Sequence, residues 1–308
     1  MNTYQNPVFQ TSDPFVLLHE DKYYLYTSNA KENTIESGYK VFVSDDLINW
    51  EDKGYCLKKG DVKGEVIVRD GYTLGFWAPE VAYKDGKFYM IYTAEHHLGV
   101  AVSDSPLGPF IQEEKKFLFD YEAFDGSFFI DEDGCVYLYY RDMRFNRIAG
   151  VKMSGDMLSV EESTHQILIT PAEFPWELVV ENEIGTEGPF VIKHNGYYYL
   201  TYSANDFRNK DYAIGCATSK NPLGPFKKYE GNPILKRNDK VFGTGHHCFT
   251  TSKDGKKLVC VYHAHNSNTQ VEPRMTCIDL AEFVPQQNGP DILKINGPTS
   301  EPMPLINE

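Results

Sequence analysis

The stretch TEGPFVIKHNGYYYLTYS, residues 186–203, has the pattern of two β-strands joined by a tight turn. Apolar and aromatic residues fill both runs, and the Asn-Gly pair between them supplies the positive backbone φ that a hairpin turn needs. The first run begins with an acid, Glu187. A carboxylate at the edge of an apolar strand loses water on folding and must gain a partner. The position of Glu187 therefore suggests a functional role as well as a hairpin.

The same pattern recurs along the chain. Its copies are DPFVLLHEDKYYLYT from Asp13, APEVAYKDGKFYMIYT from Ala78, FDGSFFIDEDGCVYLYY from Phe124 and HCFTTSKDGKKLVCVYH from His247. Further apolar runs follow the hairpins, and two nearly identical segments, SDSPLGPF and SKNPLGPF, begin at residues 103 and 219. Repeats of roughly sixty residues with about four strands each are typical of propeller blades. The sequence therefore predicts an all-β, five-bladed β-propeller.

We expect residues 1–308 to form this propeller as a single domain. Long stretches with helical periodicity and caps are scarce. A sandwich or a jelly roll would also be all-β, but neither fold generates five similar units of four strands. The segment from residue 281 onward is expected to complete the fifth blade.

The composition excludes several classes of partner. A net charge of −14 argues against nucleic acid, whose phosphates need a basic face, and disfavours an anionic substrate. No apolar run approaches the length of a membrane span, so no membrane partner is expected. The beginning of the chain lacks the features of a signal peptide, which predicts a cytoplasmic protein as given, or a periplasmic or secreted one if a signal peptide was removed. The six cysteines lack zinc-ligand spacing, and the sequence makes no prediction of oligomeric state.

The innermost strands of a propeller all begin at one end of the central axis, so their first residues should converge. These residues are Asp13, the segment Trp77–Glu80, Asp125, Glu187 and the pair His246–His247. Three carboxylates at corresponding positions of three repeats would then meet in one pocket beside a tryptophan. Ser, Thr or Asn would cap a strand equally well, and clustered carboxylates repel one another. We therefore interpret the three acids as functional.

Six motifs in order resemble glycoside hydrolase family 43. They are SDPFVL, FWAPEV, FDGSFF, TEGPFV, GTGHH and EPRMTCIDL, beginning at residues 12, 76, 124, 186, 243 and 272. The resemblance covers nearly the whole chain and implies a five-bladed propeller that hydrolyses a pentosyl bond with inversion. By motif position, Asp13 would be the general base, Glu187 the general acid, and Asp125 the carboxylate that adjusts the pKa and orientation of the acid. An inverting site of this kind needs two carboxyl groups about 6.5–9.5 Å apart, with a water molecule between them.

The resemblance also implies residues that bind substrate. Trp77 and Phe124 would wall the sugar pocket, and packing between blades is the alternative explanation for these two aromatic residues. Arg274 would hydrogen-bond the pentose hydroxyls, unless it pairs with a structural acid. No cofactor is required for the chemistry, but His246 matches an axial histidine that often lies near calcium or another ion. The adjacent His247 replaces the smaller polar residue expected there, which leaves the ion ligands open.

Other functions stay possible at this point. A non-catalytic carbohydrate-binding propeller would have lost at least one carboxylate, and none is missing. A glycoside phosphorylase would need a basic cluster for phosphate, and Arg274 is the only basic residue within the motifs. A retaining fructan-cleaving enzyme would carry signatures that are absent here. We favour α-L-arabinofuranose over β-D-xylose, and expect pocket depth to depend on loops at residues 29–37, 173–184 and 205–210.

Overall fold

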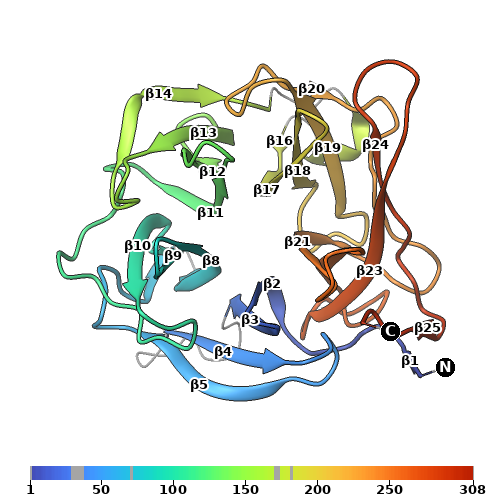
Figure 1. The fold of residues 1–308 in the computed structure, drawn as a ribbon, viewed down its shortest axis with the longest axis horizontal. Coiled ribbons are helices and arrows are strands. Elements are labelled where there is room, and N and C mark those ends of the chain that lie inside the picture. Colours follow the sequence, from blue (N-terminus) through green and yellow to red (C-terminus); the bar gives the residue numbers. More distant parts are fainter. Residues whose placement is uncertain (1, 29–37, 70–71, 170–173, 181–182, 308) are drawn as a thin grey trace.

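The computed structural model describes residues 2–28, 38–69, 72–169, 174–180 and 183–307. Five antiparallel sheets surround a central axis, and the first strand of each sheet lies nearest to that axis (Figure 1). The predicted five-bladed β-propeller is thereby confirmed. The loop at residues 29–37, and parts of the loop at 173–184, lie outside the described residues.

Each blade is a meander in which consecutive strands are neighbours. Blades one and two contain β2 (Ser12–His19), β3 (Lys22–Ser28), β4 (Gly38–Ser44) and β5 (Glu51–Lys58), then β8 (Phe76–Lys84), β9 (Lys87–Ala94) and β10 (His97–Ser103). Blade three contains β11 (Ala123–Ile130), β12 (Val136–Asp142), β13 (Arg147–Met153) and β14 (Val160–Ile167). Blades four and five contain β17 (Thr186–His194), β18 (Tyr197–Ala204), β19 (Ala213–Ser219) and β20 (Lys227–Lys228), then β21 (Gly245–Thr251), β22 (Leu258–Ala264), β23 (Met275–Val284) and β24 (Ile292–Ile295).

Blade two departs from the expected four strands. The described part of the chain gives it a three-stranded sheet, and an isolated bridge between Val102 and Ile111 stands where a fourth strand would begin. Nearby, the Phe110 amide donates to the Cys56 carbonyl in blade one at 2.7 Å. The segment after β10 therefore pairs with its own sheet at isolated points and also bonds to blade one.

The duplicated PLGPF segments have a structural role at the joints between blades. The hydroxyl of Tyr26, in blade one, donates to the carbonyl of Pro106 in blade two at 2.6 Å. In the same way, Tyr139 of blade three donates to Pro222 of blade four at 2.8 Å. Both tyrosine side chains are buried, so each hydroxyl needs such an acceptor. Tyr26 and Tyr139 are thus packing residues whose hydroxyls join neighbouring blades.

Both ends of the chain close the ring. β1 (Thr3–Tyr4) pairs with β25 (Met303–Pro304), and the segment after β1 pairs with β23 through the bridge between Phe9 and Thr276. β24 completes blade five, as expected for the segment after residue 281. Blade five is therefore held by chain segments from both termini.

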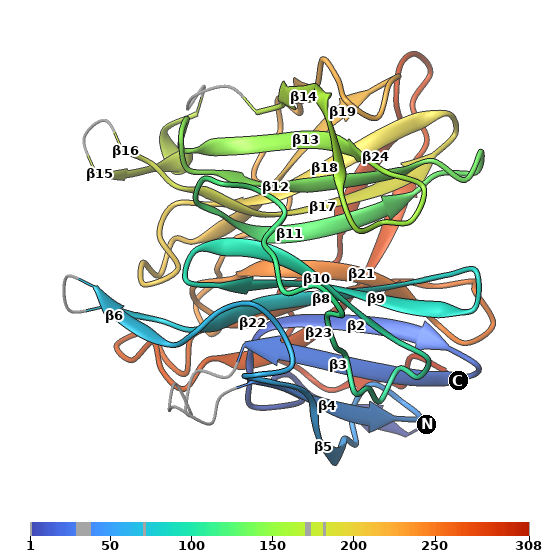
Figure 2. The same cartoon turned by 90° about the vertical axis from the view of Figure 1, so that its left-hand side faces the viewer.

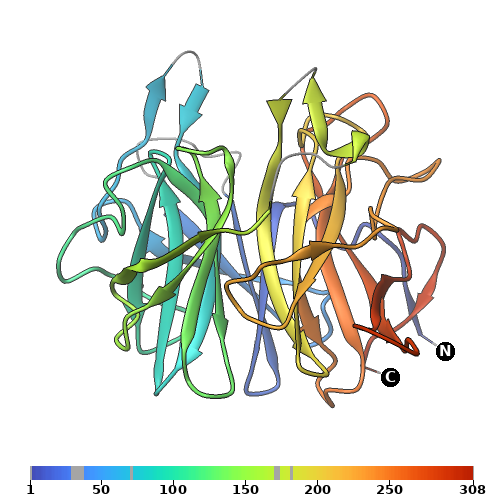
Figure 3. The same cartoon turned by 90° about the horizontal axis from the view of Figure 1, so that it is seen from above.

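Two short hairpins extend beyond the blades on the face where the innermost strands begin (Figures 2 and 3). The first consists of β6 (Ile67–Arg69) and β7 (Tyr72–Leu74), directly before β8. The second consists of β15 (Leu178–Val180) and β16 (Glu183–Ile184), between the short 3₁₀ helix η1 (Pro175–Glu177) and β17. Among the described residues, no helix has the length and apolar character needed to cross a membrane.

Candidate active site

A β-bulge interrupts the beginning of every innermost strand. At each bulge, one residue has a positive φ: Asp13 (49°), Ala78 (40°), Asp125 (55°), Gly188 (53°) and His246 (43°). Glycine adopts this left-handed conformation freely, whereas for other residues it costs about 1–2 kcal/mol. Four of the five residues are not glycine, and such strain persists where surrounding contacts enforce it, often at functional sites.

The neighbouring blade supplies a hydrogen-bond partner for most of these bulges. The contacts run from the bulge amide to the end of the preceding blade's second strand: Ala78 to Ser28 Oγ (2.7 Å), Asp125 to Thr93 Oγ1 (3.4 Å), His246 to Ser203 Oγ (2.7 Å) and Asp13 to His263 Nδ1 (3.4 Å). The four acceptor residues occupy equivalent positions in their strands. Each one pairs, across its own sheet, with the residue immediately before the bulge of the innermost strand. A ring of inter-blade bonds thus fixes the backbone at the end of the axis.

Arg141 breaks this pattern between blades three and four. It occupies the equivalent place in β12, opposite Phe124, but a guanidinium has no acceptor to offer. The Gly188 amide donates instead to Oδ2 of Asp125 at 3.0 Å. Arg141 Nη1 donates to Oε2 of Glu187 at 3.3 Å. The irregular joint therefore connects the Gly188 amide and one nitrogen of the Arg141 guanidinium to two of the predicted catalytic acids.

The three acids come together at one end of the axis, although their shared position in the repeats was predicted wrongly. Asp13 and Asp125 are bulge residues, whereas Glu187 lies one position earlier, directly before the bulge residue Gly188. Trp77 and Phe124 share that earlier position. A bulge adds a residue that sequence comparison alone does not locate, which explains the error.

Asp13 is held as an anion by cationic and polar neighbours. Arg274 Nη1 lies 2.7 Å from its Oδ1, and His263 Nδ1 and His246 Nδ1 lie 3.1 and 3.5 Å from the same atom. Burial alone would raise the pKa of Asp13, but the Arg274 guanidinium and then the two imidazoles hold this pKa well below its usual value. A carboxylate with a lowered pKa is ionised at neutral pH, which is the protonation state that a general base needs.

Asp125 has the opposite electrostatic environment. Burial first, and then the Glu187 and Asp13 carboxylates, raise its pKa to about 7 against the lowering effect of His246. His246 Nδ1 lies 3.8 Å from Oδ2 of Asp125. Glu80, deeper along β8, has a pKa raised well above its usual value, first by burial and then by Asp125. The Glu80 carboxyl group therefore ionises less readily than an ordinary glutamate.

Glu187 is oriented by two hydrogen-bond donors. Besides Arg141, the hydroxyl of Tyr212 donates to its Oε1 at 2.9 Å. Tyr212 in turn lies against His263, with ring centroids 5.7 Å apart. Because His263 contacts Asp13, the side chains of Tyr212 and His263 link the predicted acid to the predicted base.

His246 lies between the two aspartates, and no ion site is evident around it. In the described part of the chain, no three His, Cys, Asp or Glu side chains form a group that could hold a metal ion. Calcium prefers six to eight oxygen ligands, which an imidazole does not provide. His247 is buried, with Nε2 2.7 Å from Thr201 Oγ1, and burial lowers its pKa to about 3. The axial ion stays a prediction, which thermal unfolding before and after chelation would test.

The predicted sugar-binding residues lie around the acids, but the contacts of Arg274 differ from those that were expected. Besides its contact with Asp13, its Nε donates to Glu272 Oε1 at 3.0 Å, and its guanidinium lies 4.7 Å from the centre of the Phe207 ring. Arg274 thus sets the charge of the predicted base, and its contact with sugar hydroxyls stays a prediction. Phe207 marks a further side chain beside the pocket.

Several of these residues escaped sequence reasoning: Arg141, Phe207, Tyr212 and His263. Arg141 and His263 end second strands, whereas only the starts of first strands were searched. The repeats did contain a signal for these two residues. Ser or Thr occupies three of the five equivalent positions, and Arg141 and His263 occupy the other two. Phe207 and Tyr212 lie in the connection between β18 and β19, where no repeat pattern operates.

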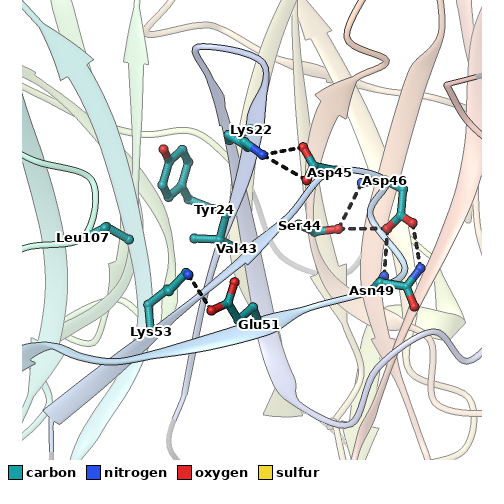
Figure 4. Close-up of a pocket in the computed structure, with 10 residues that line it drawn as sticks. All are labelled: Lys22, Tyr24, Val43, Ser44, Asp45, Asp46, Asn49, Glu51, Lys53 and Leu107. Atoms are coloured by element: carbon teal, nitrogen blue, oxygen red, sulfur yellow. Dashed lines mark hydrogen bonds and ion pairs between the residues drawn. The ribbon is translucent and has the colours of Figure 1, made fainter.

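A separate hollow lies at the opposite ends of the blade-one strands, where β3 begins and β4 ends (Figure 4). It measures about 480 Å³ and includes the Tyr24 ring. Its charges are mutually paired: Lys22 with Asp45 at 2.7 Å and Lys53 with Glu51 at 2.6 Å. The pKa values of its two aspartates, Asp45 and Asp46, are lowered by hydrogen bonds to neighbouring groups, in contrast to the raised pKa of Asp125 in the axial site.

Comparisons with known proteins identify the family of this chain. The model of the family described as glycosyl hydrolases family 43 matches residues 4–287. A crystal structure of an endo-1,4-beta-xylanase from Bacteroides thetaiotaomicron is 37% identical, with a TM-score of 0.85 over 97% of this chain and 98% of the other. A thermostable family-43 glycoside hydrolase is 39% identical, with a TM-score of 0.84 over 99% and 100% of the two chains. A beta-D-galactofuranosidase from Aspergillus niger is 26% identical over 94% of this chain and 84% of its own length. With its five blades and its axial carboxylates, this chain belongs to glycosyl hydrolases family 43 and is a glycosidase with a carbohydrate substrate.

Proposed function

We propose that the protein hydrolyses α-L-arabinofuranosyl or β-D-xylosyl bonds of plant-type oligosaccharides or polysaccharides with inversion of configuration. The observation that carries this proposal is the contrast between the acids on the axis. Asp13 is held ionised by Arg274 and two imidazoles, whereas the pKa of Asp125 is raised to about 7. Asp13 thus has the ionised form that a general base needs, whereas Asp125 keeps its proton to near neutral pH and suits a supporting role beside the proposed acid Glu187.

In the proposed reaction, Asp13 accepts a proton from the attacking water. Glu187 donates a proton to the departing oxygen, with Arg141 and Tyr212 orienting its carboxyl group. Asp125 neither attacks nor donates to the substrate. Its side chain fixes the Gly188 backbone next to Glu187, and its charge changes the field at the acid.

The choice of pentose rests on relatives. Proteins named xylosidase/arabinosidase from Humicola insolens and Bacteroides ovatus are 28% and 29% identical over 70% and 71% of this chain. They support both pentoses equally, and we retain arabinofuranose as the first candidate. A polar hollow of about 520 Å³ between Asp206 and Val271, on the site face, leaves room for further sugar units beside the pocket.

The phosphorylase alternative gains one residue from the structure, since Arg141 joins Arg274 near the axis. Each guanidinium, however, donates to a carboxylate of the site. An anionic phosphate would have to displace these carboxylates against their own charge, so hydrolysis is the better-supported reaction.

A panel of aryl glycosides tests the proposal, with α-L-arabinofuranoside, β-D-xyloside and β-D-galactofuranoside compared alongside arabinan and xylan. We expect cleavage of at least one pentoside, independent of added phosphate. Proton NMR of the first-formed sugar should show the inverted anomer. Retention of configuration, a requirement for phosphate, or cleavage confined to the galactofuranoside would each refute the proposal.

A further inference from the structure

A histidine outside the family-like motifs lies between the two aromatic residues expected to wall the sugar pocket. The His96 ring centre lies 5.0 Å from that of Trp77 and 5.4 Å from that of Phe124. On the same wall, the Arg141 guanidinium lies 5.2 Å from the centre of the Phe124 ring and contacts Glu187. His96 is therefore part of a continuous row of side chains that leads from Trp77 to the predicted acid.

The backbone holds His96 firmly in this place. Glu95 and His96 form the two-residue turn between β9 and β10, and both have positive φ values, of 53° and 61°. The His96 carbonyl accepts a hydrogen bond from the Ala123 amide at 2.7 Å, at the start of blade three. The Glu95 carboxylate accepts one from the Glu65 amide at 2.6 Å. The turn is thus fastened both to the next blade and to the segment that leads into the β6–β7 hairpin.

Arg69, from that projecting hairpin, determines which ring nitrogen of His96 carries the proton. Its Nη2 lies 3.1 Å from Nδ1 of His96, while Nη1 donates to Glu122 Oε1 at 2.5 Å. A guanidinium only donates, so Nδ1 must accept, and the proton of the neutral ring resides on Nε2. Burial lowers the pKa of His96 despite the Glu122 carboxylate 3.5 Å from Nδ1, which favours this neutral ring.

The Nε2–H group is free to meet a ligand. No described residue offers this group an acceptor. Because Nε2 is also not among the buried polar atoms that lack a hydrogen-bond partner, it is exposed to solvent. The side chain as a whole is 18% exposed. We propose that His96 is a sugar-binding residue whose Nε2–H donates a hydrogen bond to an oxygen of a neutral pentosyl unit, and that Arg69 is the positioning residue that maintains this tautomer. The inference rests on the proposed function and adds a recognition contact to it.

Two substitutions at His96 test the contact through steady-state kinetics on the preferred pentoside. His96→Phe keeps an aromatic ring between Trp77 and Phe124 but removes the donor, so KM should rise about 3- to 10-fold with kcat within about twofold. His96→Gln restores a donor and should recover part of this loss. His97→Phe is the matched control, because His97 is in the same hairpin but lies against Phe117, with ring centres 4.9 Å apart. It should leave KM unchanged.

Arg69→Met tests the positioning role through a spectroscopic signature. In nitrogen-15 NMR of the histidine side chains, the unaltered protein should give the Nε2–H pattern for His96, and Arg69→Met should give a mixture of tautomers. An Nδ1–H pattern in the unaltered protein, or an unchanged KM in His96→Phe, would overturn the inference while leaving the proposed function intact. Absence of any glycoside hydrolysis by the unaltered protein would instead refute the proposed function, and this inference with it.

Discussion

Replacing Asp125 by Asn should make the protein more stable at neutral and alkaline pH while reducing its activity. Asn keeps an oxygen that accepts the Gly188 amide but cannot ionise. In the folded protein, Asp125 releases its proton near pH 7, because of burial first and then of the Glu187 and Asp13 carboxylates, compared with the usual 3.8. The folded state therefore binds more protons than the unfolded chain between these pH values, and stability falls as pH rises through this window.

The size of this effect follows from the two pKa values. A difference from 3.8 to about 7 corresponds to about 4 kcal/mol of destabilisation above pH 7. Since neighbouring groups relax around the charge, we expect Asp125→Asn to gain about 1–3 kcal/mol at pH 8 and nothing below pH 4. Urea unfolding from pH 4 to pH 9 measures the gain, with Asn in place of the exposed Asp239 as control. A gain that is absent, or equal at all pH values, would refute the electrostatic reasoning.

Four further substitutions separate the roles of individual charged groups. Glu187→Ala should slow cleavage of a natural glycoside by roughly 10²–10⁴-fold but affect an activated aryl glycoside much less. Asp13→Ala should impair cleavage of both substrates. If Glu187→Ala slows cleavage of both substrates equally, Glu187 is not the general acid. Arg274→Ala should raise the pKa of Asp13, so that the acid side of the profile of kcat/KM against pH moves to higher pH; an unmoved profile would contradict the role given to this cation. Lys228→Met should cost about 3–5 kcal/mol in urea unfolding, because it removes the ammonium group 2.8 Å from the fully buried Glu177 carboxylate, which also accepts a hydrogen bond from the neutral Tyr202 hydroxyl; a loss below about 1 kcal/mol would contradict this.

The sequence was sufficient to predict the blades because turn chemistry and strand pattern repeat together. The Asn195-Gly196 turn, for example, lies between β17 and β18 as its dipeptide predicts. The Asp125 and Glu187 side chains reach the same end of the axis for the same reason. Their offset by one position was not predictable, since a bulge depends on contacts with the neighbouring blade, such as the bond from Gly188 to Asp125.

Other parts of the site depend on contacts that no local pattern encodes. The Tyr212 hydroxyl reaches Glu187 across 25 residues of sequence, and Arg274 reaches Asp13 across 261. The missing fourth strand of blade two has a similar origin, because the segment around Phe110 bonds to blade one. Burial and charge pairing between distant segments decide these features.

The irregular joint at Arg141 has a consequence for anyone who redesigns this protein by consensus. Averaging the five repeats would place a small hydroxyl residue at position 141, as at Ser28, Thr93 and Ser203, and would score the change as an improvement in regularity. The Gly188 amide would then have a second possible acceptor, and the Glu187 carboxylate would lose its guanidinium. A perfectly repetitive version would have more regular joints between its blades but a lower glycosidase activity. Arg141 should therefore be retained in any such design.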